Sequence, residues 1–223
     1  MTLASLLAIS ALLRSLEQNQ VPSLTVLKIS TSETIQGNCD VTLMNNHSRS
    51  ALAWVITRLP DRRSAGTSDN TTVPDLGVAP GETKVTRFSC PEGEPLPAVE
   101  VTGVLYDDGS RAGDEAVLER SLFSVQRERA RALRELATFL SATQLSAKPN
   151  VSLTDLFSEL IDQASGAGIG AAGARLSAKN AVQRFAQHAS GTPISAEQID
   201  AAKRAVTGEL IAAAARLEMW SQK

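Results

Sequence analysis

The sequence predicts an α+β protein in which an antiparallel β-sandwich is followed by a C-terminal helical bundle. Between about residues 24 and 106, short apolar segments alternate with turn residues, a pattern typical of antiparallel strands. From residue 114 onward, apolar residues recur with the 3.6-residue period of α-helices. We therefore divide the 223-residue chain into an N-terminal segment (1–20), a sandwich domain (21–112) and a helical region (113–223).

The composition is that of an ordinary globular protein, with 43% hydrophobic and 21% charged residues. A formal net charge of −2 gives no electrostatic reason to expect nucleic acid, which usually binds a net basic surface. We therefore expect no nucleic-acid partner. We recognise no cofactor or metal signature in the sequence, and we expect neither.

The N-terminal segment begins with an apolar run, residues 2–13, which has the length of an export signal and is too short to span a bilayer. It lacks preceding basic residues and a following small-x-small cleavage site. The alternative is an ordinary helix that buries Leu3, Leu6 and Leu7. We expect an atypical export signal, and hence a secreted or periplasmic protein, with a cytoplasmic location as the alternative. No other stretch has transmembrane length, so we expect no integral membrane segment.

Five segments of the sandwich domain have the alternation and the bounding turns of strands: residues 24–30, 39–44, 51–59, 84–90 and 99–106. Between the third and fourth lies a polar stretch, residues 61–75, that is longer than an ordinary connection. Such a stretch is either a flexible excursion or a binding loop. Because loops on a rigid sandwich often carry binding, we name its candidate binding residues as Arg62, Arg63, Asp69 and Asn70.

The chain contains two cysteines, Cys39 and Cys90, both in the sandwich domain. Their separation does not have the spacing of a zinc site. They are a candidate disulfide between two strands if the compartment is oxidising. The alternative is a pair of buried free thiols that behave as small hydrophobic side chains.

A resemblance rests on four short features, namely Asn45-Asn-His-Ser48, Ala53-Trp54, Pro80-Gly-Glu82 and Asp108-Gly-Ser110. With the strand pattern, they make about residues 23–110 similar to the immunoglobulin-like sandwich modules of bacterial exported and cell-surface proteins. Trp54 on the third strand and Cys39 on the second resemble the buried tryptophan and cysteine of such sandwiches. The resemblance implies a binding or spacer unit and assigns no functional residue. These modules usually have seven strands, whereas the pattern here shows five or six.

The helical region begins with a long helix to about residue 142, with an apolar stripe from Val117 to Leu140. Ser152 is placed to cap a second helix, and residues 174–189 form a third. Ser195 and Gln198 form a capping box for the last helix, which has an apolar stripe of Ile199, Val206, Leu210, Ala213, Leu217 and Trp220. Because the connections are short, we expect an antiparallel bundle.

Three clusters in this half of the chain contain residue types that are common in ligand-binding or metal-binding sites. Gly168-Ile-Gly170-Ala-Ala-Gly173 has the spelling of a dinucleotide loop, but no strand precedes it, so we expect a flexible hinge. Arginines crowd residues 120–134, but interspersed glutamates favour a salt-bridged solvent face. The acidic residues between Asp107 and Glu115 favour a helix N-terminus over a calcium site.

These observations favour a non-enzymatic exported module with a binding or structural role. The chain has two histidines and no recognisable nucleophile elbow, zinc-protease or P-loop signature. The alternative is an assembly protein, a homodimer formed through the stripe of the last helix. A carboxylate-dependent hydrolase is the third hypothesis, because the pairing of acids is three-dimensional.

Overall fold

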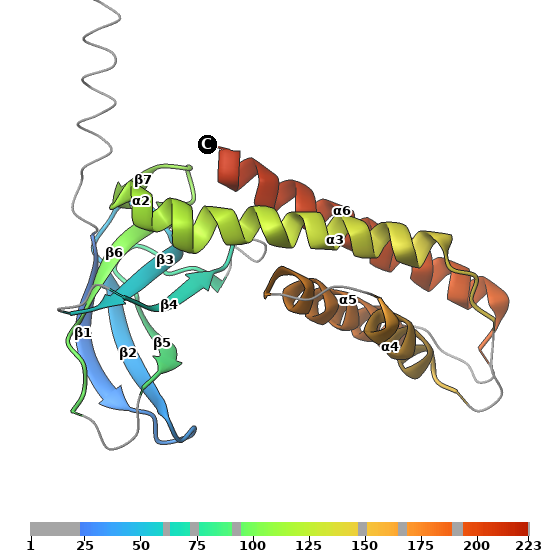
Figure 1. The fold of residues 1–223 in the computed structure, drawn as a ribbon, viewed down its shortest axis with the longest axis horizontal. Helices are drawn as coiled ribbons and strands as arrows, with labels where there is room; N and C mark the ends of the chain where they lie inside the picture. Colours follow the sequence, from blue (N-terminus) through green and yellow to red (C-terminus); the bar gives the residue numbers. More distant parts are fainter. Residues whose placement is uncertain are drawn as a thin grey trace, which may run out of the picture. The chain divides into compact units, whose positions relative to one another are not determined.

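The computed structural model describes residues 23–59, 63–71, 76–90, 95–146, 151–164, 169–188 and 194–222. The chain forms two compact units, Met1–Phe123 and Ser124–Lys223 (Figure 1). The boundary between them lies later along the chain than the predicted one at residue 112. The N-terminal segment 1–20, on which the export-signal prediction rests, lies outside the described residues.

The first unit contains two antiparallel sheets with seven strands among the described residues. One sheet has the order β1-β2-β5, and the other has the order β4-β3-β6-β7. The strands are β1 (Leu24–Thr31), β2 (Asn38–Asn45), β3 (Ala51–Arg58), β4 (Ser64–Asp69), β5 (Thr83–Ser89), β6 (Val99–Tyr106) and β7 (Arg111–Gly113). The predicted α+β class with antiparallel sheets is confirmed.

The two sheets share one hydrophobic core. On β2 the alternate residues Cys39, Val41 and Leu43 are buried, and on β3 Trp54 and Ile56 enter the same core. The outer face of β3 is buried as well, since its first seven residues are all inaccessible to solvent. Two short elements cover that outer side, the α-helical turn α2 (Glu115–Leu118) and the π-helical turn η2 (Glu119–Phe123). The start of the predicted first helix therefore belongs to the sandwich unit.

Two strands escaped the sequence prediction. The stretch 61–75 was predicted to be one long loop, but it contains β4, an edge strand without alternating apolar residues. Gly66 of β4 lies against β5, and a Cβ at this position would approach the Phe88 Cβ to 3.1 Å. The strand β7 has three residues and ends at Gly113, with a φ of 100° that glycine accepts readily. Both strands are held by backbone pairing and close contact rather than by an apolar face.

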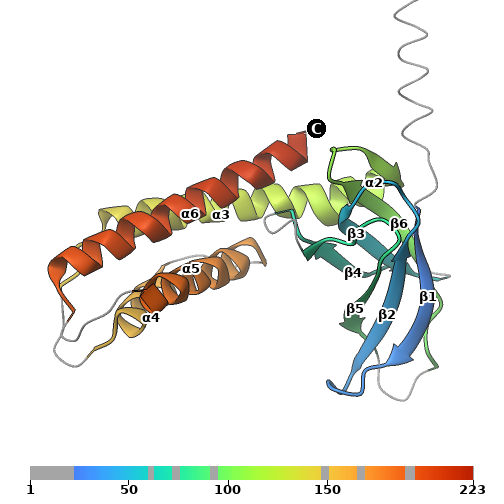
Figure 2. The same ribbon diagram turned by 180° about the vertical axis from the view of Figure 1, so that it is seen from behind.

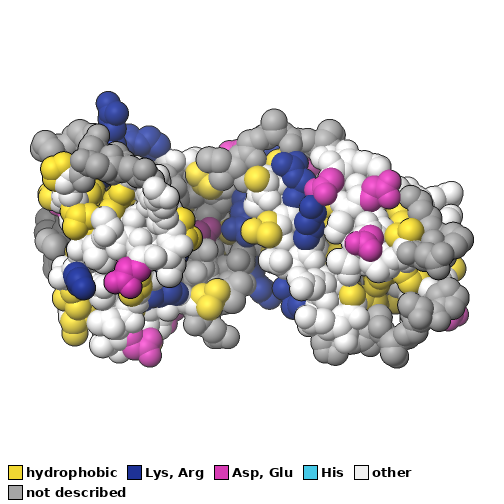
Figure 3. Space-filling model, turned by 90° about the horizontal axis from the view of Figure 1, so that it is seen from below, with side chains coloured by type: hydrophobic (Ala, Val, Ile, Leu, Met, Phe, Trp, Pro, Cys, Tyr) yellow, Lys and Arg dark blue, Asp and Glu magenta, His cyan; other side chains and the backbone are white. Residues whose placement is uncertain are grey.

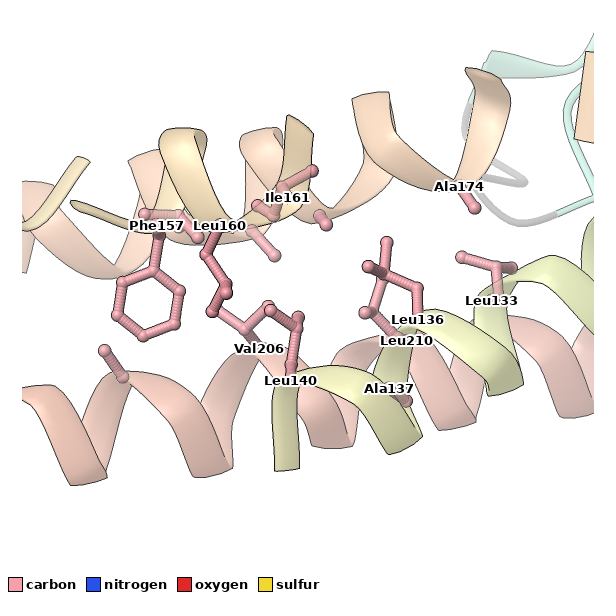
Figure 4. Packing of buried hydrophobic residues seen from close by; sticks show 14 of the residues in the cluster. Leu133, Leu136, Ala137, Leu140, Phe157, Leu160, Ile161, Ala174, Val206 and Leu210 are labelled. Atoms are coloured by element: carbon pink, nitrogen blue, oxygen red, sulfur yellow. The ribbon is translucent and has the colours of Figure 1, made fainter. Parts of the chain in front are cut away.

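The second unit contains four helices: α3 (Ser124–Ala142), α4 (Leu153–Gln163), α5 (Ile169–His188) and α6 (Ala196–Gln222). Figure 4 shows that side chains of α3 and α6 point towards those of α4 and α5, with Leu140 and Val206 near Leu160. Leucines at helical spacing bury one face of α3, α4 and α6 in this way, whereas the buried face of α5 consists of Ala174, Ala178, Ala181 and Val182.

The predicted caps of α4 and α6 are present. The Ser152 hydroxyl accepts a hydrogen bond from the Asp155 backbone N–H at 3.0 Å. The Ser195 hydroxyl accepts one from the Gln198 N–H, and the Gln198 side chain accepts one from the Ser195 N–H in return. These bonds satisfy amide groups that have no partner within the helix.

The prediction of a flexible glycine-rich hinge before α5 is wrong for the residues of it that the structure describes. Helix α5 begins at Ile169, so Gly170 and Gly173 are helical residues. A Cβ on Gly170 would lie 3.0 Å from the backbone carbonyl carbon of Glu128 on α3. The glycines therefore allow α5 to approach α3 closely. Close helix packing accounts for them.

Most side chains of the apolar stripe predicted on the last helix are buried against other helices of the same unit. Ile199, Val206, Leu210, Leu217 and Trp220 are buried, and α6 packs against α3 and α5. A dimer formed through α6 therefore requires another face of that helix. Across the described ranges, no helix combines the length and the apolar character needed to cross a bilayer.

Candidate functional surface

Three turns meet at one end of the sandwich, and we call them the turn cluster. They are residues 46–50 between β2 and β3, residues 79–82 before β5, and residues 107–110 between β6 and β7. Asn45, which is fully buried at the end of β2, connects the first two turns. Its side-chain amide donates to the carbonyls of Arg49 and Val78, each at 2.8 Å. Its backbone N–H donates to the carbonyl of Glu82 at 3.0 Å.

The third turn is bound directly to the first. The backbone N–H of Asp107 donates to the Ser50 carbonyl at 3.0 Å, and the Ser50 N–H donates to the Asp107 carboxylate at 3.3 Å. The Arg49 guanidinium lies 3.4 Å from the Asp108 carboxylate. The His47 ring stacks on Tyr106, with 4.1 Å between centroids. The three turns therefore form one braced surface with exposed polar side chains.

The electrostatics of this surface are set by local hydrogen bonds. The hydroxyl and the backbone N–H of Ser110 donate to the Asp108 carboxylate and hold the pKa of that carboxyl below its ordinary value. The Arg49 charge acts in the same direction. The cluster therefore presents the ionised Asp108 carboxylate beside the Arg49 guanidinium and the His47 ring.

His47 is not arranged as the base of a hydrolase triad. In a triad, the imidazole Nδ1–H donates to a carboxylate that orients the ring. Here Nδ1 of His47 accepts a hydrogen bond from the backbone N–H of Arg49 at 3.1 Å. The ring is held by its turn and by Tyr106.

The predicted disulfide between Cys39 and Cys90 is present, with 5.6 Å between the Cα atoms. It joins the start of β2 to the residue after β5, at the opposite end of β2 from the turn cluster. Since β2 and β5 are neighbours, the bridge lies within one sheet. The cysteines of antibody domains instead join two sheets.

The residues predicted to form a binding loop do not lie together in the structure. Arg62 lies outside the described residues, and Arg63 is exposed just before β4. Asp69 and Asn70 lie at the other end of β4, roughly 20 Å away for a strand of this length. There the Asp69 carboxylate accepts hydrogen bonds from the Thr71 N–H and hydroxyl, while the Asn70 side chain donates to Ser68. Arg63 and the Asp69–Asn70 pair therefore lie at opposite ends of β4. Their role in binding stays a prediction.

Side chains of the other two charged clusters, the arginines of α3 and the acidic residues before α2, bind other parts of the chain. On α3, Arg134 pairs with Glu218 of α6, and Arg129 donates to the Ser177 hydroxyl of α5. Asp114 caps α2 by accepting from two backbone N–H groups. Figure 3 shows Lys and Arg side chains beside Asp and Glu side chains on the face it displays. Within the described residues, no three His, Cys, Asp or Glu side chains gather as metal ligands.

Tyr106, the one tyrosine of the chain, reports on the turn cluster. Burial raises the pKa of its hydroxyl above the ordinary value near 10. Because the folded-state pKa is raised, the protonated Tyr106 hydroxyl contributes to the free energy of unfolding. This contribution is complete below the unfolded-state pKa and is lost as pH rises through the folded-state pKa. We expect tyrosinate absorbance to appear above pH ~10 in the native protein and near pH ~10 in urea. Equal midpoints in the two conditions would show that Tyr106 is not buried in solution.

Comparison with known proteins finds no matching family model, no matching curated protein and no matching solved structure. The turn cluster therefore has to be understood from its own geometry. Sequence reasoning did not identify it as a site, because its turns are far apart along the chain. The available signal was that three of the four features behind the immunoglobulin-like resemblance, at residues 45–48, 80–82 and 108–110, all meet there.

Proposed function

We propose that the protein is an exported, non-enzymatic binding or structural module, with an immunoglobulin-like sandwich whose turn cluster is the recognition surface. The observation that carries this proposal is the bracing of three distant turns by Asn45, Ser50 and Arg49. Loops held on a rigid sandwich commonly serve binding, because the scaffold removes the entropic cost of ordering them.

The strand order supports the immunoglobulin-like assignment. The first, second and fifth strands share one sheet, and the third, sixth and seventh share the other. Constant-type immunoglobulin domains divide these six strands in the same way. The difference concerns β4, which pairs with β3 here, whereas the fourth strand of a constant-type domain completes the first sheet.

The disulfide supports export. Disulfides form and persist in oxidising compartments such as the periplasm and the extracellular space, and they are rare in the cytosol. The Cys39–Cys90 bridge and the apolar run of residues 2–13 therefore favour the same location by independent arguments.

Site-specific photo-crosslinking tests the recognition surface. A photoreactive residue at Ser48, which is exposed in the turn cluster, is expected to give a discrete adduct in the native host. The matched control is the same residue at Glu33, which is exposed in the turn between β1 and β2 at the opposite end of the sandwich. Equal labelling at both positions, or no adduct at Ser48, would contradict the proposal.

A further inference from the structure

The outward side of α6 is apolar although it faces solvent. Its inner side is buried in the bundle core, and in Figure 2 the helix passes in front of α3. Ile211 and Met219 are each 45% exposed on the outer side. Counted at 100° per residue from Ala205 to Met219, one arc about 120° wide contains these side chains and no charge, while the exposed Arg204 continues the same arc one residue earlier. We call the part from Ala205 to Met219 the outer arc. It consists of Ala205, Gly208, Ile211, Ala212, Ala215 and Met219.

Helix α6 therefore has apolar residues on two sides, whereas a surface helix usually has one apolar side that faces the core. The bundle covers the inner side of α6 and leaves the outer arc open. Gly208 is notable because a Cβ there would meet no atom within 4 Å. A glycine inside a helix lowers stability relative to alanine, and no residue that the structure describes packs against this one. Close approach of another helix would account for it.

We propose that the outer arc binds the outer arc of a second copy of the chain in an antiparallel homodimer. An arrangement with its two-fold axis between Ile211 and Ala212 places Gly208 opposite Ala215 of the second copy. Small residues then face each other along the axis, so the two helices can approach closely. Met219 lies opposite Arg204, and its thioether can pack on the aliphatic stem of that arginine.

The charges beside the outer arc are complementary in this arrangement. The two-fold places Arg204 of one copy on the same side as Glu218 of the other, and Arg216 on the same side as Glu209. Glu218 and Glu209 already pair with Arg134 and Arg184 in their own chain. Each carboxylate has two oxygens and can accept from a second donor. At each edge of the interface, an arginine of one copy thus lies near a glutamate of the other, which favours this partner and this orientation.

The contact has the size of a weak dimer. From Arg204 to Gln222 the helix is about 27 Å long, and two helices in contact over that length bury on the order of 800 Å² in total. Stable complexes bury more, so we expect a dissociation constant on the order of 10–100 μM. This inference concerns only the second unit and does not depend on the proposed recognition surface or on export.

Sedimentation equilibrium of the full chain between about 5 and 300 μM tests the proposal across that range. We expect the mass of the wild-type protein to rise from monomer to dimer, and Ile211→Glu to weaken dimerisation at least tenfold, because two glutamates would meet at the axis. The control is Leu176→Glu, which places the same charge on α5 at a side chain that is 62% exposed and outside the outer arc. A wild-type monomer at the highest concentration, or equal loss in both variants, would overturn the proposal.

Thiol cross-linking tests the orientation. Both native cysteines are in the disulfide, so a single introduced cysteine provides the one free thiol. With dissolved oxygen and a copper catalyst as the oxidant, Gly208→Cys mixed with Ala215→Cys is expected to form a mixed disulfide faster than either variant forms a homodimeric one. Faster self-coupling of each variant would indicate a parallel pair and overturn the orientation.

Discussion

Loss of the Cys39–Cys90 bridge is expected to lower the free energy of unfolding of the sandwich unit by ~4 kcal/mol. The two cysteines are 51 residues apart, so the bridge closes a long loop and removes many conformations from the unfolded chain. It also connects β2 to β5 inside the core, where Cys39 is fully buried. Urea unfolding of the Cys39→Ala/Cys90→Ala double variant, followed by circular dichroism, measures the difference.

The reductant provides the matched control. Dithiothreitol is expected to shift the unfolding midpoint of the wild-type protein to that of the double variant and to leave the double variant unchanged. If the wild-type midpoint does not move after complete reduction, the bridge does not stabilise the fold. In that case the cysteines contribute through their packing alone.

Replacement of Gly170 by valine is expected to lower the free energy of unfolding of the helical unit by about 2–3 kcal/mol. A Cβ at this position would lie 3.0 Å from the backbone carbon of Glu128, 3.0 Å from the Cγ of the same residue and 3.1 Å from the backbone nitrogen of Arg129. Backbone cannot move aside as a flexible side chain can, so α5 would have to separate from α3. Thermal and urea unfolding of Gly170→Val measure this cost.

Gly208→Val is the matched substitution on α6, where no atom lies within 4 Å of the added Cβ. Its stability is expected to lie within about 0.5 kcal/mol of the wild-type value, because valine is a somewhat better helix former than glycine. Both variants are compared at low micromolar concentration, below that of the proposed α6 pairing. Equal destabilisation by the two substitutions would show that the contact of Gly170 with α3 does not determine the cost.

Periodicity predicted most of the fold because burial leaves a regular trace in the sequence. The alternation in β2 and the leucine stripe of α3 each reflect one face in contact with a core. The caps at Ser152 and Ser195 were predictable because their hydrogen bonds are local. The strand β4 was missed because an edge strand composed of Ser, Ala, Gly, Thr and Asp has no apolar face, and its pairing with β3 is visible only in three dimensions.

The glycines before α5 illustrate the limit of local reasoning. Glycine-rich sequence usually indicates a turn or a hinge, yet Gly170 is helical because α3 requires a residue without a side chain there. The turn cluster likewise depends on contacts between residues that are far apart in the sequence. Asn45 looked like an ordinary turn residue, and its central position follows from long-range bonds to Val78 and Glu82. Long-range contacts of this kind are not encoded in residue spacing.

The disulfide and the proposed export together are the central claim, and the intact mass of the protein purified from its native host tests them most directly. The protein should be fractionated by compartment and weighed with and without reduction before alkylation. We predict an exported protein that has lost its N-terminal segment and that takes up alkylating reagent at Cys39 and Cys90 only after reduction. A cytosolic protein with an intact N-terminus and two thiols alkylated without reduction would contradict the account.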